Sequence, residues 1–354
     1  MRRRSFIRLI GFGAVAMALG SFGAFSISEN SELKKVDFHA HAILQSYVDG
    51  LKKLKLDAQE IDGLSLPKWT LDAHLRFMDA AGIDFTVLSM PSPHIYNGDV
   101  NENISCEVAR KINTELYELC RIHPDRFGFV AVLPLPSIDG SIEEIRHSLS
   151  TLNAAGVEVS SNSDGVYLGD EMLDPIFKEL NSRNSLVIIH PTPAKNLPHE
   201  GVVTGKVMEL YEHPADTTRA VLNMIANGTL EKFPNIKFVV PHCGAFLPYM
   251  KQRADTMFKS LSSMNAVNVK ENLKKFYFDL AGDPTPEQLD MLLKITDENH
   301  LVYGSDFPNM PEQILLENKN RLMNYLTNAI GRKKFIAIMQ KYFWENFKLH
   351  ALLQ

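Results

Sequence analysis

The sequence predicts a (β/α)8 barrel, the fold also called a TIM barrel, with a long loop between its first strand and first helix. Strand-like and helix-like segments alternate from about Lys34 onward, and eight such units are what one barrel requires. Several strand-like segments are unbroken apolar runs, which is typical of parallel strands buried on both faces. A doubly wound open sheet is the alternative, but no glycine-rich phosphate loop follows the first strand.

The predicted elements follow one another in barrel order. The expected strands cover residues 35–39, 85–90, 127–133, 157–160, 186–190, 236–241, 276–280 and 301–303. Helical periodicity lies between them at 71–81, 107–122, 141–154, 173–183 and 217–227. The stretch 44–69 is long for a strand-to-helix loop, and such loops lie at the catalytic face of a barrel. We therefore expect it to help cover the site, with a solvated surface excursion as the alternative.

The composition indicates that residues 31–354 form one globular barrel domain. Hydrophobic residues make up 45% of the chain and charged residues 22%, as in a soluble protein with a sizeable core. The formal net charge of −5 gives no reason to expect nucleic acid as a partner. No internal repeat or compositional break marks a second domain.

Residues 1–30 differ in composition from the rest of the chain and are predicted to be an export signal that precedes the barrel. A basic start is followed by an uncharged apolar stretch, 9–27, which is too short and too rich in glycine and alanine for a convincing membrane span. The order Arg3-Arg4-Ser5-Phe6-Ile7-Arg8 resembles a twin-arginine signal, which carries folded proteins across the bacterial inner membrane. We expect a periplasmic protein, with an uncleaved inner-membrane anchor as the alternative.

His39 and His41 stand two residues apart at the end of the first predicted strand. Residues i and i+2 of a strand point the same way, so two imidazoles there could grip one metal ion. Three more polar residues stand at later strand ends: His190 at the fifth, His242 after the sixth and Asp306 after the eighth. Because the carboxyl ends of barrel strands meet at one face, we expect these five side chains to form one site.

Ligand chemistry narrows the ion that such a site would hold. Neutral imidazoles with one carboxylate favour a divalent transition metal over Mg²⁺ or Ca²⁺. We expect a single ion, zinc, with manganese as the alternative, held by His39, His41, His190 and Asp306. His242 is then the natural general acid or base, and Asp306 is the second candidate for handling a proton.

These residues stand in motifs that resemble the amidohydrolase superfamily, and specifically its decarboxylase branch. That branch includes decarboxylases of 2-amino-3-carboxymuconate-6-semialdehyde, γ-resorcylate and 6-methylsalicylate. The matching stretches are Asp37-Phe38-His39-Ala40-His41, 165–170, 189–191, 241–246 and 304–308. The resemblance covers about residues 36–347 and implies metal ligands at His39, His41, His190 and Asp306, with a catalytic histidine at His242.

One absence favours a mononuclear site. Binuclear members of the superfamily carry a bridging lysine at the end of the fourth strand, but residues 156–162 of this chain contain no lysine. Glu158 could bridge two ions from that strand, although a structural role is the favoured interpretation. The missing lysine points to the decarboxylase branch rather than to the binuclear hydrolases.

Three further residues are candidate substrate contacts. The resemblance implies that Arg253 reaches the substrate carboxylate of a neighbouring subunit, which favours a homodimer; pairing with Asp255 on a helix surface is the alternative. Trp69 could stack on a ring substrate or plug the loop, and His94 could line the pocket or lie on the surface. The second substrate arginine of the muconate enzyme has no counterpart here, because Lys68 precedes Trp69. The absence of that arginine leaves the identity of the substrate open.

The expected function is metal-dependent, non-oxidative decarboxylation of a small aromatic or unsaturated carboxylic acid, closest to 6-methylsalicylate. A mononuclear metal-dependent hydrolase of a lactone, amide or ester is the alternative, since both reactions use the same ligands. A metal-binding or partner-binding protein without activity is disfavoured, because every expected ligand is present.

Overall fold

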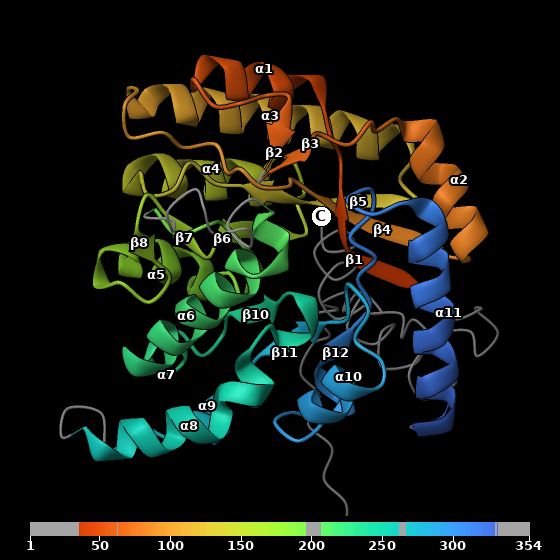
Figure 1. Cartoon of the computed structure of the whole chain (residues 1–354). Helices are drawn as coiled ribbons and strands as arrows, with labels where there is room; N and C mark the ends of the chain where they lie inside the picture. Colours follow the sequence, from red (N-terminus) through yellow and green to blue (C-terminus); the bar gives the residue numbers. More distant parts are fainter. Residues whose placement is uncertain (1–34, 62, 196–206, 262–266, 330, 332–354) are drawn as a thin grey trace, which may run out of the picture. The chain divides into compact units, whose positions relative to one another are not determined.

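The computed structural model describes the chain except residues 1–34, 62, 196–206, 262–266, 330 and 332–354. Its centre is an eight-stranded parallel sheet in which sequential strands are neighbours (Figure 1). The strands are β1 (Val36–His41), β4 (Phe85–Ser89), β5 (Phe127–Val132), β6 (Gly156–Ser160), β9 (Leu186–His190), β10 (Lys237–Val240), β11 (Tyr277–Asp279) and β12 (Leu301–Val302). All eight predicted strands are therefore present, with ends shifted by one or two residues.

The sheet curls until its last strand meets its first, as a barrel requires. The amide of Phe38 donates to the carbonyl of Tyr303 at 2.9 Å, and the amide of His41 donates to that of Phe307 at 2.7 Å. A parallel bridge also joins Ala40 to Phe307. The barrel prediction is confirmed and the open doubly wound alternative is wrong.

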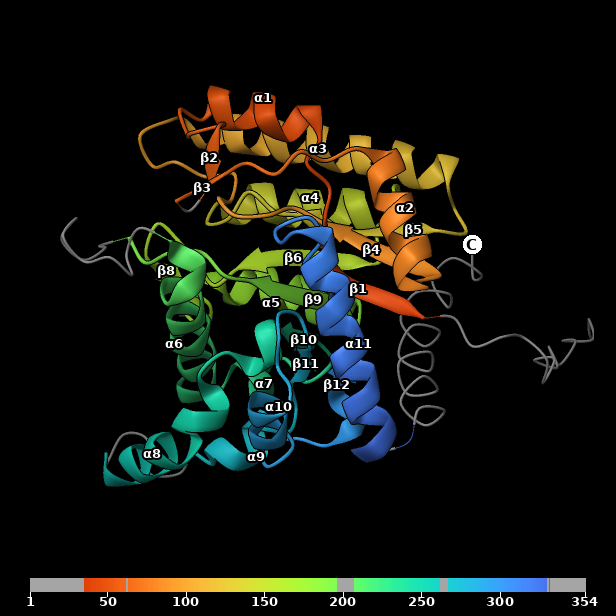
Figure 2. The ribbon, with the colours of Figure 1, turned by 45° about the vertical axis from the view of Figure 1, so that its right-hand side comes forward.

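Helices surround the strands in both views (Figures 1 and 2). They are α1 (Gln45–Lys53), α2 (Leu71–Ala81), α3 (Glu102–Ile122), α4 (Ile138–Ser150), α5 (Asp174–Ser182), α6 (Glu212–Ala226), α7 (Thr229–Lys232), α8 (Leu247–Ser260), α9 (Val269–Leu273), α10 (Glu287–Leu292) and α11 (Glu312–Ala329). The helix α2 begins where Thr70 accepts a hydrogen bond from the amide of Ala73, and it ends at the left-handed Gly82. Within the described part of the chain, no helix is long and apolar enough to cross a membrane.

The stretch 44–69 is not a simple loop, because it contains α1 and a small hairpin of β2 (Glu60–Ile61) and β3 (Leu64–Ser65). A second hairpin, β7 (Asn162–Ser163) with β8 (Val166–Tyr167), follows β6. The helix α1 packs on α3, and Gly50 permits this approach since a Cβ there would lie 2.5 Å from Val108. Tyr47 of α1 is fully buried. The alternative of a solvated excursion is wrong for this helix.

The barrel interior is apolar at its base and polar at the carboxyl ends of the strands. A separate cluster of buried side chains fills the base: Val36, Phe38, Phe85, Val87, Val130, Leu186, Ile188, Val239 and Val302. The pairing of β1 with β4 shifts register between Asp37 and Ala40, which marks a β-bulge. Because the bulge moves the alternation by one residue, Phe38 below it and His39 and His41 above it all face the interior.

Candidate metal centre

Three imidazoles and one carboxylate converge at the carboxyl ends of the strands. The Nε2 atoms of His39 and His41 lie 3.2 Å apart, and Asp306 Oδ1 lies 3.2 Å from His41 Nε2 and 3.5 Å from His39 Nε2. The ring of His190 lies 4.9 Å from that of His41 between centroids. One ring nitrogen of each of these three histidines lies within 4.8 Å of the others. The structure thus brings together the four residues that the sequence predicts as ligands.

The outer nitrogen of each ring is already engaged, which determines what the inner nitrogen can do. His39 Nδ1 lies 2.8 Å from Asp279 Oδ2, and His190 Nδ1 lies 2.9 Å from the carbonyl oxygen of Pro191. His41 Nδ1 lies 3.0 Å from the hydroxyl of Ser89. When each Nδ1 donates its hydrogen, each Nε2 keeps a lone pair directed at the centre of the cluster. This donor set fits a divalent transition metal.

Asp279 is a site residue that the sequence analysis missed. It lies at the end of β11, is fully buried, and bonds to His39 through Oδ2. Its Oδ1 accepts from the amides of His242 and Ala281 at 2.9 and 3.0 Å. The signal in the sequence was an aspartate within an apolar strand, in phase with the interior of the barrel.

The buried histidines of the cluster differ in their affinity for a proton. Burial lowers the pKa of His39, but the carboxylates of Asp279, Asp306 and Asp37 together outweigh burial and raise it to about 9. Burial lowers the pKa of both His41 and His190. Burial raises the pKa of Asp306, yet the nearby ring of His242 and the charge of His39 hold it well below the ordinary value. A cation entering this site would therefore replace the proton on His39.

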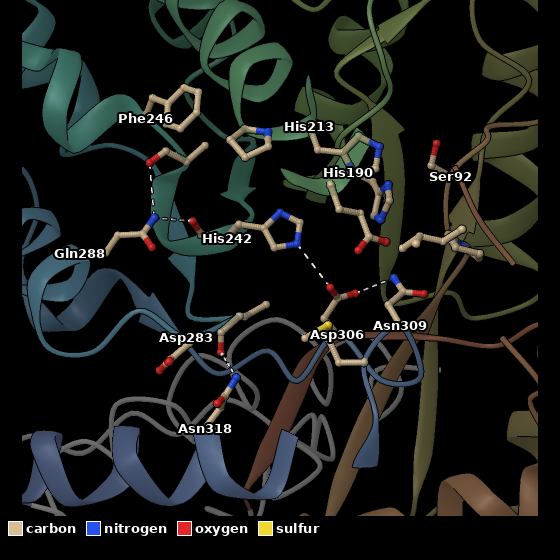
Figure 3. A pocket seen from close by; sticks show the side chains of 18 of the residues that line it. Ser92, His190, His213, His242, Phe246, Asp283, Gln288, Asp306, Asn309 and Asn318 are labelled. Atoms are coloured by element: carbon tan, nitrogen blue, oxygen red, sulfur yellow. Dashed lines mark hydrogen bonds and ion pairs between the residues drawn. The ribbon is translucent and has the colours of Figure 1, made fainter. Parts of the chain in front are cut away.

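His242 stands beside the cluster rather than within the histidine triplet. It begins the 3₁₀ turn η4 (His242–Gly244), and its Nε2 lies 3.6 Å from Asp306 Oδ2. Both residues have left-handed backbones, with φ of 55° for His242 and 62° for Asp306. Such strain is found at functional sites, where the surroundings hold it. Here Gln288 Nε2 donates to the carbonyls of His242 and Ala245 (Figure 3).

A cavity of about 620 Å³ lies over the cluster, with His190, His242 and Asp306 in its lining (Figure 3). Its apolar lining includes Leu64, Pro67, Pro91, Pro214, Phe246, Pro248, Tyr249, Met291 and Met310. Leu64 and Pro67 belong to the stretch 44–69, which therefore helps to cover the site as expected. The cavity offers room for a small aromatic molecule above the ligand cluster.

The structure places the three candidate substrate residues in different surroundings. The ring of His94 packs on His190, with centroids 5.6 Å apart. Trp69 donates to His74 Nδ1 at 3.0 Å and packs against the core, so it plugs the loop and does not line the cavity. Arg253 is exposed on α8 and does not line the cavity of its own chain. Asp255 bonds to Lys259 at 2.7 Å, and the expected alternative pairing with Arg253 is wrong.

Glu158 faces the barrel interior but lies outside the ligand cluster. Its Oε2 accepts from the amide of Met90 at 3.0 Å, which ties β6 to the end of β4. Burial raises the pKa of Glu158 to about 8. A buried carboxyl group that braces a backbone amide is the structural role favoured by the sequence analysis.

Comparisons with known proteins identify the family of the chain. Residues 36–346 match the amidohydrolase family model. The chain is 31% identical to the decarboxylase yanB of Aspergillus niger, over 79% of this chain and 78% of that protein. It is 29% identical to a 6-methylsalicylic acid decarboxylase of Penicillium expansum, over 83% and 90%. The crystal structure of an amidohydrolase II protein gives a TM-score of 0.79 at 31% identity, covering 86% of this chain and 99% of that one. The chain belongs to the amidohydrolase family and, within it, to the decarboxylase branch.

Proposed function

We propose that this protein is a metal-dependent, non-oxidative decarboxylase of a small aromatic carboxylic acid similar to 6-methylsalicylate. The observation that carries the proposal is a pair of overlapping groups that share His39, one with His41 and His190 and the other with His242 and Asp306. His190, His242 and Asp306 line one cavity. The relatives are named for decarboxylation and not for hydrolysis, which favours this reaction over the lactone or amide hydrolase considered from the sequence.

One divalent ion, zinc with manganese as the alternative, is proposed to bind His39, His41, His190 and Asp306. When bound, the ion would supply a Lewis acid that polarises substrate oxygen atoms. The histidines are oriented for it by Asp279, Ser89 and the carbonyl of Pro191. No bridging lysine is present at the end of β6, so one ion is proposed rather than two.

The remaining work of the site is the replacement of CO₂ by a proton. The bond between the ring carbon and the carboxyl carbon breaks, its electron pair stays on the ring carbon, and a proton from the protein joins that carbon. No electrons are gained or lost, so no redox partner is needed. His242 is proposed to deliver that proton, with Asp306, whose Oδ2 lies 3.6 Å from His242 Nε2, as the second candidate.

The first test supplies the metal-loaded protein with 6-methylsalicylate and other hydroxybenzoates and measures CO₂ and the ring product. Wild-type protein is expected to release CO₂ without ring opening. Replacing His242 by Asn should lower kcat by about 10²- to 10⁴-fold, because a general acid or base typically contributes that much. Bound metal should stay unchanged in that variant. His300→Asn, at a surface histidine paired with Asp297, is the matched control. Lactone cleavage without CO₂ release would refute the proposal.

The second test concerns Asp279 and the pH dependence of metal binding, measured in chelator-buffered Zn²⁺. The pKa of His39, about 9, lies above its ordinary value, so below pH 9 zinc must displace a proton. Zinc affinity should therefore rise about tenfold per pH unit from 7 to 9 and then level off. Asp279→Asn should remove this slope. Above pH 9 it should weaken zinc binding by about 10- to 100-fold, as loss of a ligand-orienting group does. Asp283→Asn, at the cavity rim, should change neither; an unaltered slope in Asp279→Asn would contradict the assignment.

We further propose that the protein forms a homodimer in which Arg253 acts on the partner's site. Arg253 lies on α8 between Tyr249 and Met257, and the spacing of four residues places all three on one helix face. Tyr249 is 78% exposed and Met257 45% exposed, which is unusual for side chains of this size. Tyr249 also lines the cavity. An apolar face that runs from the cavity mouth to Arg253 is what such a partner contact needs.

Mixing two inactive variants tests whether Arg253 acts across the dimer. Arg253→Ala and His190→Ala should each be inactive alone, the second through loss of the metal. Mixed dimers formed by refolding or co-expression should regain about a quarter of wild-type activity, since half of the dimers are mixed and each has one intact site. Lys259→Ala on the same helix should stay active alone. A monomer in solution, or no recovery in the mixture, would refute the proposal.

We also propose that the protein is exported by the twin-arginine route; residues 1–34 lie outside the described part of the chain. Replacing Arg3 and Arg4 by Lys should leave full-length protein in the cytoplasm, because the transport machinery reads the arginine pair. Cell fractionation of a bacterial host provides the measurement, with Arg8→Lys as the control. Equal periplasmic amounts of wild-type and doubly substituted protein would contradict this route.

A further inference from the structure

The hydroxyl of Ser92 is a buried polar group in the cavity lining that has no hydrogen-bond partner among the described residues. Ser92 is only 2% exposed and lies in the segment that follows β4. Two residues later, His94 packs its ring on the candidate ligand His190. Figure 3 shows Ser92 on the same side of the cavity as His190. Buried hydroxyl groups are normally hydrogen-bonded, so an unpartnered one in a cavity requires an explanation.

The backbone on both sides of Ser92 is held in place. Tyr47, buried in α1, directs its hydroxyl at the carbonyls of Pro91 at 3.3 Å and Pro93 at 3.0 Å. The amide of Met90 donates to Glu158 Oε2 at 3.0 Å. These contacts fix the segment while leaving the Ser92 side chain unused. The segment therefore presents a preorganised hydroxyl to whatever occupies the cavity.

The charge of the cavity indicates what kind of group Ser92 would meet. Besides Asp306, its described lining includes three acidic side chains, Glu209, Asp283 and Glu287, and neither lysine nor arginine. Within this chain's described lining, a second carboxylate on the substrate would find no cation apart from the metal site, and the proposed Arg253 of a partner is the one other positive charge. A serine hydroxyl can donate one hydrogen bond and accept others, which suits an uncharged hydroxyl group.

We propose that Ser92 determines substrate specificity by hydrogen-bonding an uncharged ring hydroxyl of the substrate, and that Tyr47 is a positioning residue for it. The inference rests on the proposed function for the aromatic acid, and it narrows the substrate class to monocarboxylates with a ring hydroxyl in addition to any oxygen placed at the metal site. The hydroxyl read by Ser92 is distinct from any oxygen placed at the metal site. An analogue without this hydroxyl leaves Ser92 unpartnered and loses affinity.

The experiment measures binding without turnover on the zinc-loaded protein. The probes are 2-nitrophenol and its ring-hydroxylated derivatives, because a nitro group resembles a carboxylate in shape and cannot leave as CO₂. Calorimetry should find one hydroxylated isomer that binds about tenfold more tightly than 2-nitrophenol, the advantage that one neutral hydrogen bond supplies. Ser92→Ala and Ser92→Cys should each reduce this ratio to about one, and Tyr47→Phe should lower it in part.

Ser105→Ala is the matched control, since Ser105 is also buried and unpartnered but does not line the cavity. It should keep the wild-type ratio. The inference is overturned if no isomer has an advantage, if the advantage survives in both Ser92 variants, or if no probe binds. The calorimetric binding assay does not depend on turnover. A failure of CO₂ release in the separate activity assay therefore refutes the proposed function, while the binding ratios still test the role of Ser92.

Discussion

The contact between Asp279 and His39 is the interaction on which the rest of the site depends. One carboxylate oxygen orients the ring of His39, and the other accepts the amides of His242 and Ala281. Asp279 therefore joins a candidate metal ligand to the backbone of the candidate acid–base residue. Burial of a carboxylate is costly unless it is paired and hydrogen-bonded, and here both conditions are met. The same contact contributes to the raised pKa of His39, so a cation that binds His39 competes with a proton.

The barrel seam, where the segment after β12 meets β1, determines where these groups can lie. Asp37 Oδ1 accepts the amides of His39 at 3.1 Å and Ser305 at 3.0 Å, which ties the bulge in β1 to the segment after β12. Gly304 stands in this seam, and a Cβ there would lie 2.7 Å from the Cβ of His39. A side chain at that position would push His39 out of the cluster. The position of Asp306 thus follows from barrel closure and not from local preference.

Much of the fold and of the ligand set could be predicted because both leave local patterns in the sequence. Apolar runs mark the strands, and polar residues at their ends mark the site. Asp279 was missed because one aspartate in a short strand, although in phase with the interior, is not linked to His39 until the barrel closes. The helix α1 was missed because Gly50 lowers the helix propensity of its sequence. The advantage of glycine there is the close packing of α1 on Val108 of α3, which the sequence does not show. The role of Trp69 could not be predicted either, because its place in the sequence does not show which way its ring points.

A small number of hydrogen bonds hold the strained backbones of the two candidate acid–base residues. His242 and Asp306 both have left-handed conformations that cost about 1 kcal/mol or more for residues other than glycine. Neither would keep this geometry alone. Asp279 holds the amide of His242, Gln288 holds its carbonyl, and the amide of Asp306 donates to the carbonyl of His39 at 2.7 Å. The separation of His242 Nε2 from Asp306 Oδ2 is therefore set by the same hydrogen bonds that position His39, the first candidate metal ligand. Metal binding and proton transfer in this protein would then respond together to any change in the seam.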